Sequence, residues 1–307
     1  MNLDLDEQAK EFGRQALRAF EAAGGDALVQ QAEAKPHARA ELVDGVLREL
    51  GTWDLNARTD TDELEAAAAL CRSAGYWALP YPVAEVLSRP GDLEVDGLSV
   101  VADVNPAAPV AGLDGPWATV TVAGTRSAVV GHGPAGPGFV APLELSAVDG
   151  GGTDVALALV LPCWTLLGML DRAMELTVAH VTMRKQFGAP LASFQGVQFQ
   201  LTDAEVERSG LDILAKHALW SVGTDQPEVT NDALALRMSA IEAADVVFRV
   251  CHQLHGAVGF CDETTLSWIS RASQPLRRTP FGLSATRAAL TQSISTHALS
   301  GLFGTAP

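Results

Sequence analysis

Four long segments in the C-terminal half of this chain have the hydrophobic period of an α-helix, at about residues 162–184, 191–222, 230–256 and 281–301. Apolar side chains recur in them at spacings of three and four residues, which places them on one face of a helix. Long helices joined by short links pack side by side in alternating directions. The pattern therefore predicts an antiparallel four-helix bundle, and this constrains the fold more than any other feature of the sequence.

The first half of the chain divides into two further regions. Residues 1–80 have a helical period, whereas residues 80–153 hold most of the prolines and many glycines around short strand-like runs such as "LSVVADV" and "WATVTVAG". The prediction is a mainly α fold with a small β middle domain. Its three parts are a helical domain at 1–80, a β-rich domain at 81–153 and a helical bundle at 154–307.

Charge and composition exclude some functions. The 37 acidic and 21 basic side chains give a net charge of −16, which argues against nucleic acid as a partner. The four scattered cysteines suit reduced thiols in a cytoplasmic protein, and the acidic N-terminal stretch is unlike an export signal. The apolar run 155–170 is shorter than the roughly 20 residues that a bilayer requires, and Pro162 interrupts it. We therefore expect no membrane span, but a core helix entered from an extended segment near Pro162.

Chemically useful side chains gather at the end of the first bundle segment, in "RKQFGAPLASFQ" (184–195). Arg184 supplies a fixed positive charge that suits phosphate, and Phe187 supplies a flat apolar face. Gly188 is predicted to end the helix, and Gln195 supplies an amide that both donates and accepts hydrogen bonds. This set of side chains suits a ligand with charged, polar and aromatic parts.

A second stretch, "QLHGAVGF" (253–260), closes the third bundle segment with Gly256 and Gly259, where backbone can approach a ligand closely. Together with the first stretch, it suits a nucleotide that carries a pyrophosphate. The alternative, in which Arg184 only caps a helix and the glycines only end one, stays open on spacing alone.

Metal-ligand residue types also occur near this second stretch. Cys251, His252, His255 and Cys261 lie close together in the sequence, but their spacing matches no zinc pattern. No metal site is predicted.

Four further side chains in the C-terminal half of the chain have simple structural interpretations. Glu205 and Glu242 are carboxylates that could act as bases, yet solvated helix faces explain them better. Trp164 and Trp268 are expected to pack in a core or an interface rather than against a cofactor.

The stretch "RKQFGAPLASFQGVQFQLTDAEVE" closely resembles the "RKQFG…FQ.VQ..LAD" segment of the flavin-dependent acyl-CoA dehydrogenases. "QLHGAVGF" and "ETTLSWISR" resemble that family's "Q.HGG.G…E..L…R" segment, and the order of the three regions also matches. The resemblance is specific over about 154–274. It implies an acyl-CoA dehydrogenase-like fold with a C-terminal four-helix bundle.

In that family the two motifs contact an FAD held mainly by the neighbouring subunit. The resemblance implies that Arg184 contacts the pyrophosphate, Phe187 packs beside the cofactor and Gln195 hydrogen-bonds to it. Residues 253–257 would lie against the adenine end, with Ala257 in place of the second glycine of the pattern. The cofactor-binding residues implied in this way are Arg184, Gln186, Phe187, Gln195, Gln253, Leu254, His255, Gly256 and Ala257.

The departures from the family concern the catalytic base, a carboxylate that removes the α-proton of the acyl thioester. Most members carry it after the last motif arginine, but the corresponding stretch 275–287 has no carboxylate. Other members carry it 26 positions before the arginine of the first motif, which is Ala158 here, followed by Leu159 in place of an arginine. Neither side chain takes up a proton. No catalytic residue is therefore assigned.

The middle region shows no clear match to the segments with which the family cradles the flavin ring, so this domain is expected to be shortened. The leading hypothesis is a subunit of a heteromeric (α2β2) acyl-CoA dehydrogenase, similar to the glutamate-lacking chain of actinobacterial enzymes of sterol side-chain breakdown. A homologous partner subunit would supply the base, the flavin ring pocket and the contact with the acyl-CoA substrate.

Two other hypotheses remain. A scaffold or regulatory homologue would stabilise its partner without touching a cofactor. A self-sufficient homo-oligomer would need an unrecognised base, for which 281–307 is the natural place, yet that stretch contains no carboxylate.

Overall fold

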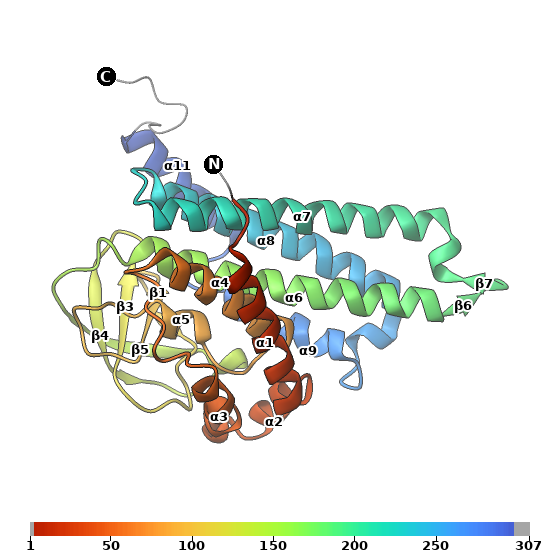
Figure 1. Cartoon of the computed structure of the whole chain (residues 1–307), viewed down its shortest axis with the longest axis horizontal. Helices are drawn as coiled ribbons and strands as arrows, with labels where there is room; N and C mark the ends of the chain where they lie inside the picture. The colour runs from red at the N-terminus through yellow and green to blue at the C-terminus, as the bar shows by residue number, and fades with distance from the viewer. Residues whose placement is uncertain (1–2, 298–307) are drawn as a thin grey trace.

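The computed structural model describes residues 3–297, which form three connected regions around one long central helix (Figure 1). An N-terminal group of helices and a small sheet lie on one side of this helix, and two further long helices lie on the other side. The mainly α class with a small β region is confirmed.

The N-terminal region consists of helices and short turns. Asp6 caps the first helix, where its carboxylate accepts a hydrogen bond from the Gln8 amide at 2.9 Å, and Asp60 caps the fourth through the amides of Asp62 and Glu63. The elements are α1 (Glu7–Ala23), α2 (Ala27–Ala34), η1 (Pro36–Ala38), α3 (Glu41–Glu49), α4 (Thr61–Tyr76) and α5 (Val83–Leu87).

Helix α4 docks against the central helix α6 (Val155–Met183) at two glycines. A Cβ atom at Gly75 would lie 1.8 Å from the backbone oxygen of Thr165, and one at Gly168 would lie 1.9 Å from that of Arg72. No other residue type fits such a close crossing. The two helices are therefore fixed in register by backbone contact.

The middle region forms a five-stranded sheet in the order β1-β3-β4-β5-β2, in which β1 and β3 are parallel. The strands are β1 (Gly97–Val101), β2 (Ala107–Ala108), β3 (Trp117–Thr121), β4 (Arg126–His132) and β5 (Ala141–Ala147), with η2 (Pro137–Phe139) before the last. A buried ion pair of 2.7 Å between Arg126 and Asp154 ties the sheet to the start of α6.

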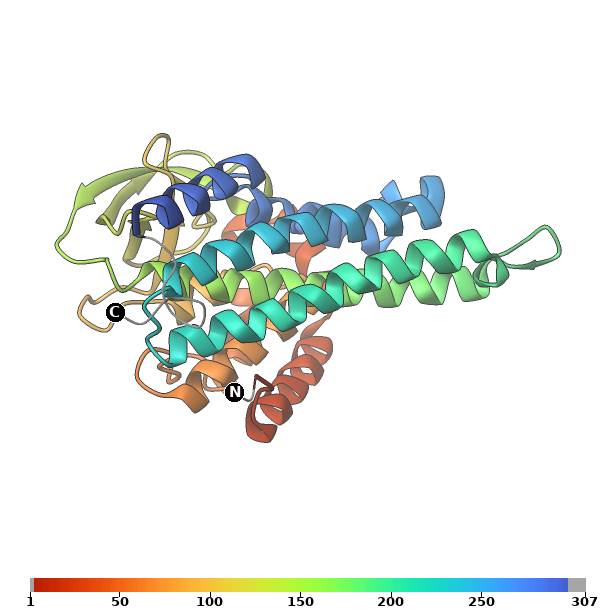
Figure 2. The ribbon, with the colours of Figure 1, turned by 90° about the horizontal axis from the view of Figure 1, so that it is seen from above.

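The bundle consists of α6, α7 (Gln195–Gly223), α8 (Val229–His255) and α11 (Leu283–His297). Short elements complete it: β6 (Lys185–Gln186), β7 (Ala189–Pro190), η3 (Leu191–Ser193), η4 (Gly256–Phe260), α9 (Thr265–Ala272) and α10 (Gln274–Arg278). The second, third and fourth long helices lie close to their predicted ranges, and residues 298–301 of the last prediction are outside the described residues. Figure 2 shows α6, α7 and α8 extending together beyond the N-terminal helices and the sheet.

The predicted start of α6 was wrong. The helix begins at Val155 and contains Pro162, where an extended entry was expected. Proline has no N–H, so the carbonyl oxygen of Ala158 loses its usual donor four residues ahead. Burial of the apolar residues 155–161 holds the helix together across this gap. Helix α6 is long and apolar enough to cross a membrane, but 78% of its most apolar window is buried inside the protein, as in a core helix.

Candidate functional site

The first motif forms the turn at the far end of the bundle. Helix α6 ends at Met183, and Arg184 adopts an extended conformation while its N–H donates to the His180 carbonyl at 2.8 Å. The next residues form the β6–β7 hairpin, which closes through Phe187 and Gly188 at φ values of 54° and 81°. Gly188 was predicted to end the helix. This was wrong, because the chain leaves the helix four residues earlier and uses the glycine for a two-residue hairpin turn.

The side chains of this hairpin face outward. Arg184, Gln186 and Phe187 are exposed, and the Phe187 side chain is 92% accessible although it is large and apolar. Its ring meets the edge of Phe194 at a centroid distance of 6.3 Å. An exposed aromatic pair at the tip of a protruding hairpin is typical of a surface that binds another molecule.

Gln195 is the first residue of α7 and is exposed. The capping residue is Phe194, which has no side-chain acceptor for the free amides, and the first turn contains no acidic side chain. The positive end of a 29-residue helix therefore lies open beside Arg184 in the same turn of the bundle. Both features favour an anionic ligand.

The second motif ends α8 at the same end of the bundle. Gly256 reverses the chain after His255 with a φ of 66°, and Gln253, Gly256 and Ala257 are exposed. The Leu254 side chain packs into the hydrophobic core instead, so only its backbone can reach a ligand at this surface.

Stacked imidazoles join the two motifs. The ring of His255 lies on that of His180 with centroids 4.3 Å apart and planes inclined by 21°. Burial lowers the pKa of both histidines, and the nearby charge of Arg184 lowers that of His180 further. Two stretches about 60 residues apart thus form one surface, which is called the end surface below and consists of residues 184–195 and 253–257.

The two base positions lie far from this end surface. Ala158 is buried and lines a small cavity together with Glu85, Leu276 and Thr279. Buried Arg237 donates hydrogen bonds to the carbonyl oxygens of Leu276 at 3.0 Å and Phe281 at 2.9 Å, and so fixes the stretch 275–281.

Glu85 is the carboxylate that the sequence interpretation missed. It lies on α5 and lines both this small cavity and a neighbouring larger one. Burial raises its pKa to about 7, against the opposing influence of the Arg39 charge. The signal in the sequence was a single acid within the apolar stretch "LPYPVAEVL".

Other candidate residues have structural partners. Glu205 pairs with Arg208 at 2.5 Å and Glu242 with Arg287 at 2.7 Å, as expected for helix faces. Trp164 is fully buried in the core.

Two rings near the second motif also have partners. Trp268 donates to the Asp262 carbonyl at 2.6 Å and lies under Arg271. His252 stacks on Phe260, and residues 3–297 hold no group of three or more metal-ligand side chains.

The end surface has the features of part of a site for a nucleotide cofactor. Within residues 3–297 no ion pair involving the Arg184 guanidinium is described, the α7 amides have no side-chain cap, and the backbone at Gly256 is open. These residues fit the pyrophosphate and adenine portions of an FAD.

Comparison with known proteins finds similarity to acyl-CoA dehydrogenases. Residues 160–282 match the family described as "Acyl-CoA dehydrogenase, C-terminal domain". The chain has the acyl-CoA dehydrogenase fold, a long helical bundle with a helical region and a small sheet packed against it.

Curated relatives match over the bundle. The chain is 34% identical over 92 residues to acyl-CoA dehydrogenase FadE28 of Mycobacterium tuberculosis (strain ATCC 25618 / H37Rv), covering 30% of this chain and 27% of that protein. Acyl-CoA dehydrogenase FadE27 of the same strain is 34% identical over 146 residues, covering 40% of this chain and 38% of that protein. The matched part thus spans about a quarter to two fifths of these relatives.

Solved structures match over nearly the whole chain. The ChsE4-ChsE5 complex from Mycobacterium tuberculosis superimposes with a TM-score of 0.73 at 17% identity, over 98% of this chain and 100% of that one. Butyryl-CoA dehydrogenase from Megasphaera elsdenii gives a TM-score of 0.72 at 14% identity, over 96% of this chain and 100% of that one. At these identities the likeness concerns the fold.

Proposed function

We propose that this protein is a cytoplasmic subunit of a heteromeric, FAD-dependent acyl-CoA dehydrogenase that contributes half of an FAD site at its end surface. The observation that carries the proposal is the meeting of both family motifs at the His180–His255 stack, with Arg184 and the α7 amides open to solvent. A homologous partner subunit completes the site and contacts the acyl-CoA substrate.

The end-surface residues have separate roles in this proposal. Arg184 and the positive end of α7 bind the pyrophosphate, Gln195 donates a hydrogen bond, and the exposed ring of Phe187 packs beside the cofactor. The backbone at 253–257 lies against the adenine. A bound FAD would supply the acceptor for the hydride that leaves the β-carbon of the acyl chain. This chain holds the cofactor and supplies no group that moves the α-proton.

The partner supplies the base because neither of the family's two base positions carries a carboxylate here. Ala158 is a buried alanine, and Arg237 fixes the stretch 275–281, which contains no acidic residue. Oxidation of an acyl thioester requires α-proton removal together with hydride transfer. A complete reaction centre therefore needs a second polypeptide.

An apolar stripe on α7 supports a protein partner. Phe199, Val206 and Ile213 recur every seven residues and are 64%, 63% and 59% exposed. The seven-residue spacing puts them on one face of the helix, continuous with the end surface at Gln195. A row of large exposed apolar side chains along one helix is typical of a protein interface.

The resemblance of the fold to the ChsE4-ChsE5 complex, and to a structure described as a Tcur3481-Tcur3483 steroid acyl-CoA dehydrogenase, supports an α2β2 assembly acting on a steroid side chain. This is the finer part of the proposal and rests on fold analogy.

Co-expression with a homologous acyl-CoA dehydrogenase that carries the base tests the proposal. We expect a yellow complex on size exclusion, little or no FAD with this chain alone, and loss of flavin from the complex with Arg184→Ala. The matched control is Arg48→Ala, which removes an exposed arginine of α3 that forms an ion pair with Asp44. Tight, saturable FAD binding by this chain alone would contradict the shared site.

The alternative is a scaffold that stabilises its partner without touching FAD, favoured by the absence of a base and by the small sheet. The same Arg184→Ala complex distinguishes the two, because a scaffold would leave both flavin content and activity unchanged.

A further inference from the structure

The larger cavity beside Glu85 lies at the meeting point of all three regions. Its walls come from α2, the segment 78–82, α5, η2, α6 and α10. Its volume is about 80 Å³, roughly half that of an engineered cavity that binds benzene. The end surface and the assignments above do not use it.

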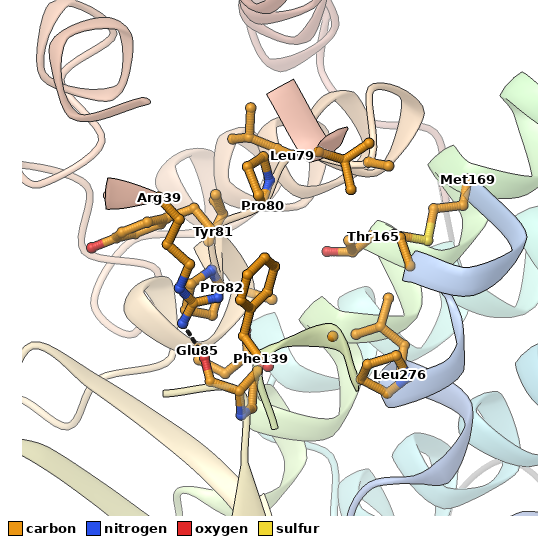
Figure 3. Close-up of a pocket in the computed structure, with 18 of the residues that line it drawn as sticks. Arg39, Leu79, Pro80, Tyr81, Pro82, Glu85, Phe139, Thr165, Met169 and Leu276 are labelled. Atoms are coloured by element: carbon orange, nitrogen blue, oxygen red, sulfur yellow. Dashed lines mark hydrogen bonds between the residues drawn. The ribbon is translucent and has the colours of Figure 1, made fainter. Parts of the chain in front are cut away.

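The lining of the cavity is amphipathic. Figure 3 shows Arg39, Tyr81 and Glu85 at one end, and Thr165, Met169 and Leu276 at the other. Apolar side chains make up most of the remaining wall. A ligand that fits this cavity has a short apolar part and one polar head.

Arg39 is the unusual residue of the polar end. Its side chain is only 1% exposed, and its guanidinium lies over the Phe139 ring at 4.3 Å. One terminal nitrogen donates to the Pro109 carbonyl at 2.5 Å, but the buried Nε has no hydrogen-bond partner. Within residues 3–297 no ion pair of Arg39 with a carboxylate is described. The charge of Glu85 acts on Arg39, but no direct ion pair between the two is described. A buried cation without a contacting anion is costly, and this favours an anionic ligand.

The number of free donors decides which anion fits. A phosphate group needs several converging donors, whereas Arg39 is the one cationic side chain in the described lining of this cavity. A carboxylate needs fewer donors and leaves its hydrocarbon tail for the apolar walls. The small volume restricts that tail to a few carbon atoms.

We propose that this cavity is a binding site for a short-chain organic carboxylate, with its head at Arg39 and Glu85 and its tail toward Met169 and Leu276. The site is independent of the FAD proposal, because it needs neither the cofactor nor the partner subunit.

Glu85 gives the site a pH dependence. The titratable groups that line the cavity are Glu33, Arg39, Tyr81 and Glu85. Burial lowers the pKa of Arg39 to about 10 and raises that of Tyr81 to about 12, so neither changes its charge near neutral pH. Glu85, with a pKa raised to about 7, takes up a proton and shares it with the bound carboxylate. Binding therefore strengthens as the pH falls from 8 to 6.

Isothermal titration of the full chain with sodium butyrate tests this site. At pH 6 we expect one butyrate per chain, with a dissociation constant on the order of 1 mM, as suits a ligand of this size. Butan-1-ol, which has the same tail without the charge, is expected to bind at least tenfold more weakly. Equal binding of the two compounds, or no saturable butyrate binding at ten times that concentration, would overturn the proposal.

Two variants test whether Arg39 and Glu85 bind the carboxylate group of the ligand. Arg39→Gln is expected to weaken butyrate binding at least tenfold, and Glu85→Gln to remove its dependence on pH between 6 and 8. The matched control is Arg89→Gln, since Arg89 also donates to backbone carbonyls, those of Trp53 and Leu55, but does not line the cavity. If Arg39→Gln does not fold, the Glu85→Gln variant and the comparison of butyrate with butan-1-ol still test the proposed site. Unchanged pH dependence in Glu85→Gln would also count against the site.

Discussion

His180 and His255 stack with their ring centroids 4.3 Å apart, and this contact joins the end of α6 to the end of α8. The Nδ1 of His255 lies 2.9 Å from the Cys251 carbonyl oxygen, which orients the ring, and the His180 carbonyl holds the Arg184 amide. The positions of Arg184 and of residues 253–257 therefore depend on one another. A ligand that binds one motif meets the other in a fixed arrangement.

The stacked pair predicts a loss of stability in mild acid. Burial lowers both pKa values in the folded state, so the unfolded chain binds protons more readily below pH 6.5. The contribution to the free energy of unfolding is full at pH 7.5. This contribution falls as the pH drops below the histidine pKa of the unfolded chain. It is constant again below the pKa values of the two histidines in the folded chain.

Urea denaturation at pH 7.5 and pH 5 measures this effect. His255→Phe keeps a flat ring on His180 and removes one titrating group, so the pH-dependent loss should be smaller than in the native chain. His217→Phe, on α7 away from the pair, is the control and should leave the loss unchanged. An identical pH dependence in His255→Phe and the native chain would rule out this role for the stack.

The glycine crossing of α4 and α6 predicts a large loss of stability on adding one methyl group. In Gly75→Ala the new Cβ would meet the Thr165 backbone oxygen, which cannot rotate away, so the helices must separate. Overpacking of this kind costs about 3 kcal/mol of the free energy of unfolding.

Gly45→Ala is the matched control, because Gly45 lies in α3 with nothing within 4 Å of a new Cβ. This change should stabilise the chain by about 0.5 to 1 kcal/mol, since alanine restricts the unfolded state. Thermal or urea unfolding measures the change in the free energy of unfolding for both variants. Similar changes at the two sites would disprove backbone contact at the crossing.

The strained and exposed position of Phe187 predicts that a substitution there can preserve the stability of the chain and still impair its function. A non-glycine residue at φ 54° is strained, and this one gains little packing because its ring is exposed. Phe187→Asn gives the hairpin a preferred residue pair for two consecutive positive φ values. The free energy of unfolding of the isolated chain should stay the same or rise by up to about 1 kcal/mol.

The same variant should lose flavin when assembled with the partner subunit, because the aromatic face beside the cofactor is gone. Absorbance of the complex at the flavin band gives the readout. A marked loss of stability in the isolated chain would mean that Phe187 is held for folding rather than for binding.

Much of the fold could be predicted because the period of the apolar residues is long and regular in α7 and α8. The start of α6 could not be predicted, because Pro162 lies within this helix and the seven residues before it, 155–161, are all buried. Local preference favours a break at proline, and tertiary burial overrides it.

The candidate site was predictable to the extent that its residues lie in recognisable stretches. The meeting of the two motifs depends on the bundle returning α8 to the end of α6, which spacing alone does not encode. Glu85 escaped notice since its importance comes from two cavities built by distant segments. The unpaired state of Arg39 is likewise a property of the packed structure.

The α7 stripe predicts that one charge can block assembly without unfolding the chain. Val206 lies at the centre of the stripe and is largely exposed, so Val206→Asp should change the free energy of unfolding by no more than about 0.5 kcal/mol. An aspartate there would be buried without a partner in the complex, so association with the homologous subunit should weaken at least tenfold. The control is Val104→Asp, because Val104 is 75% exposed but lies in the β region away from α7. Analytical size exclusion of the co-expressed subunits measures the outcome. If Val206→Asp still forms the complex at native concentration, the partner binds elsewhere, and the end surface must be completed from a different direction.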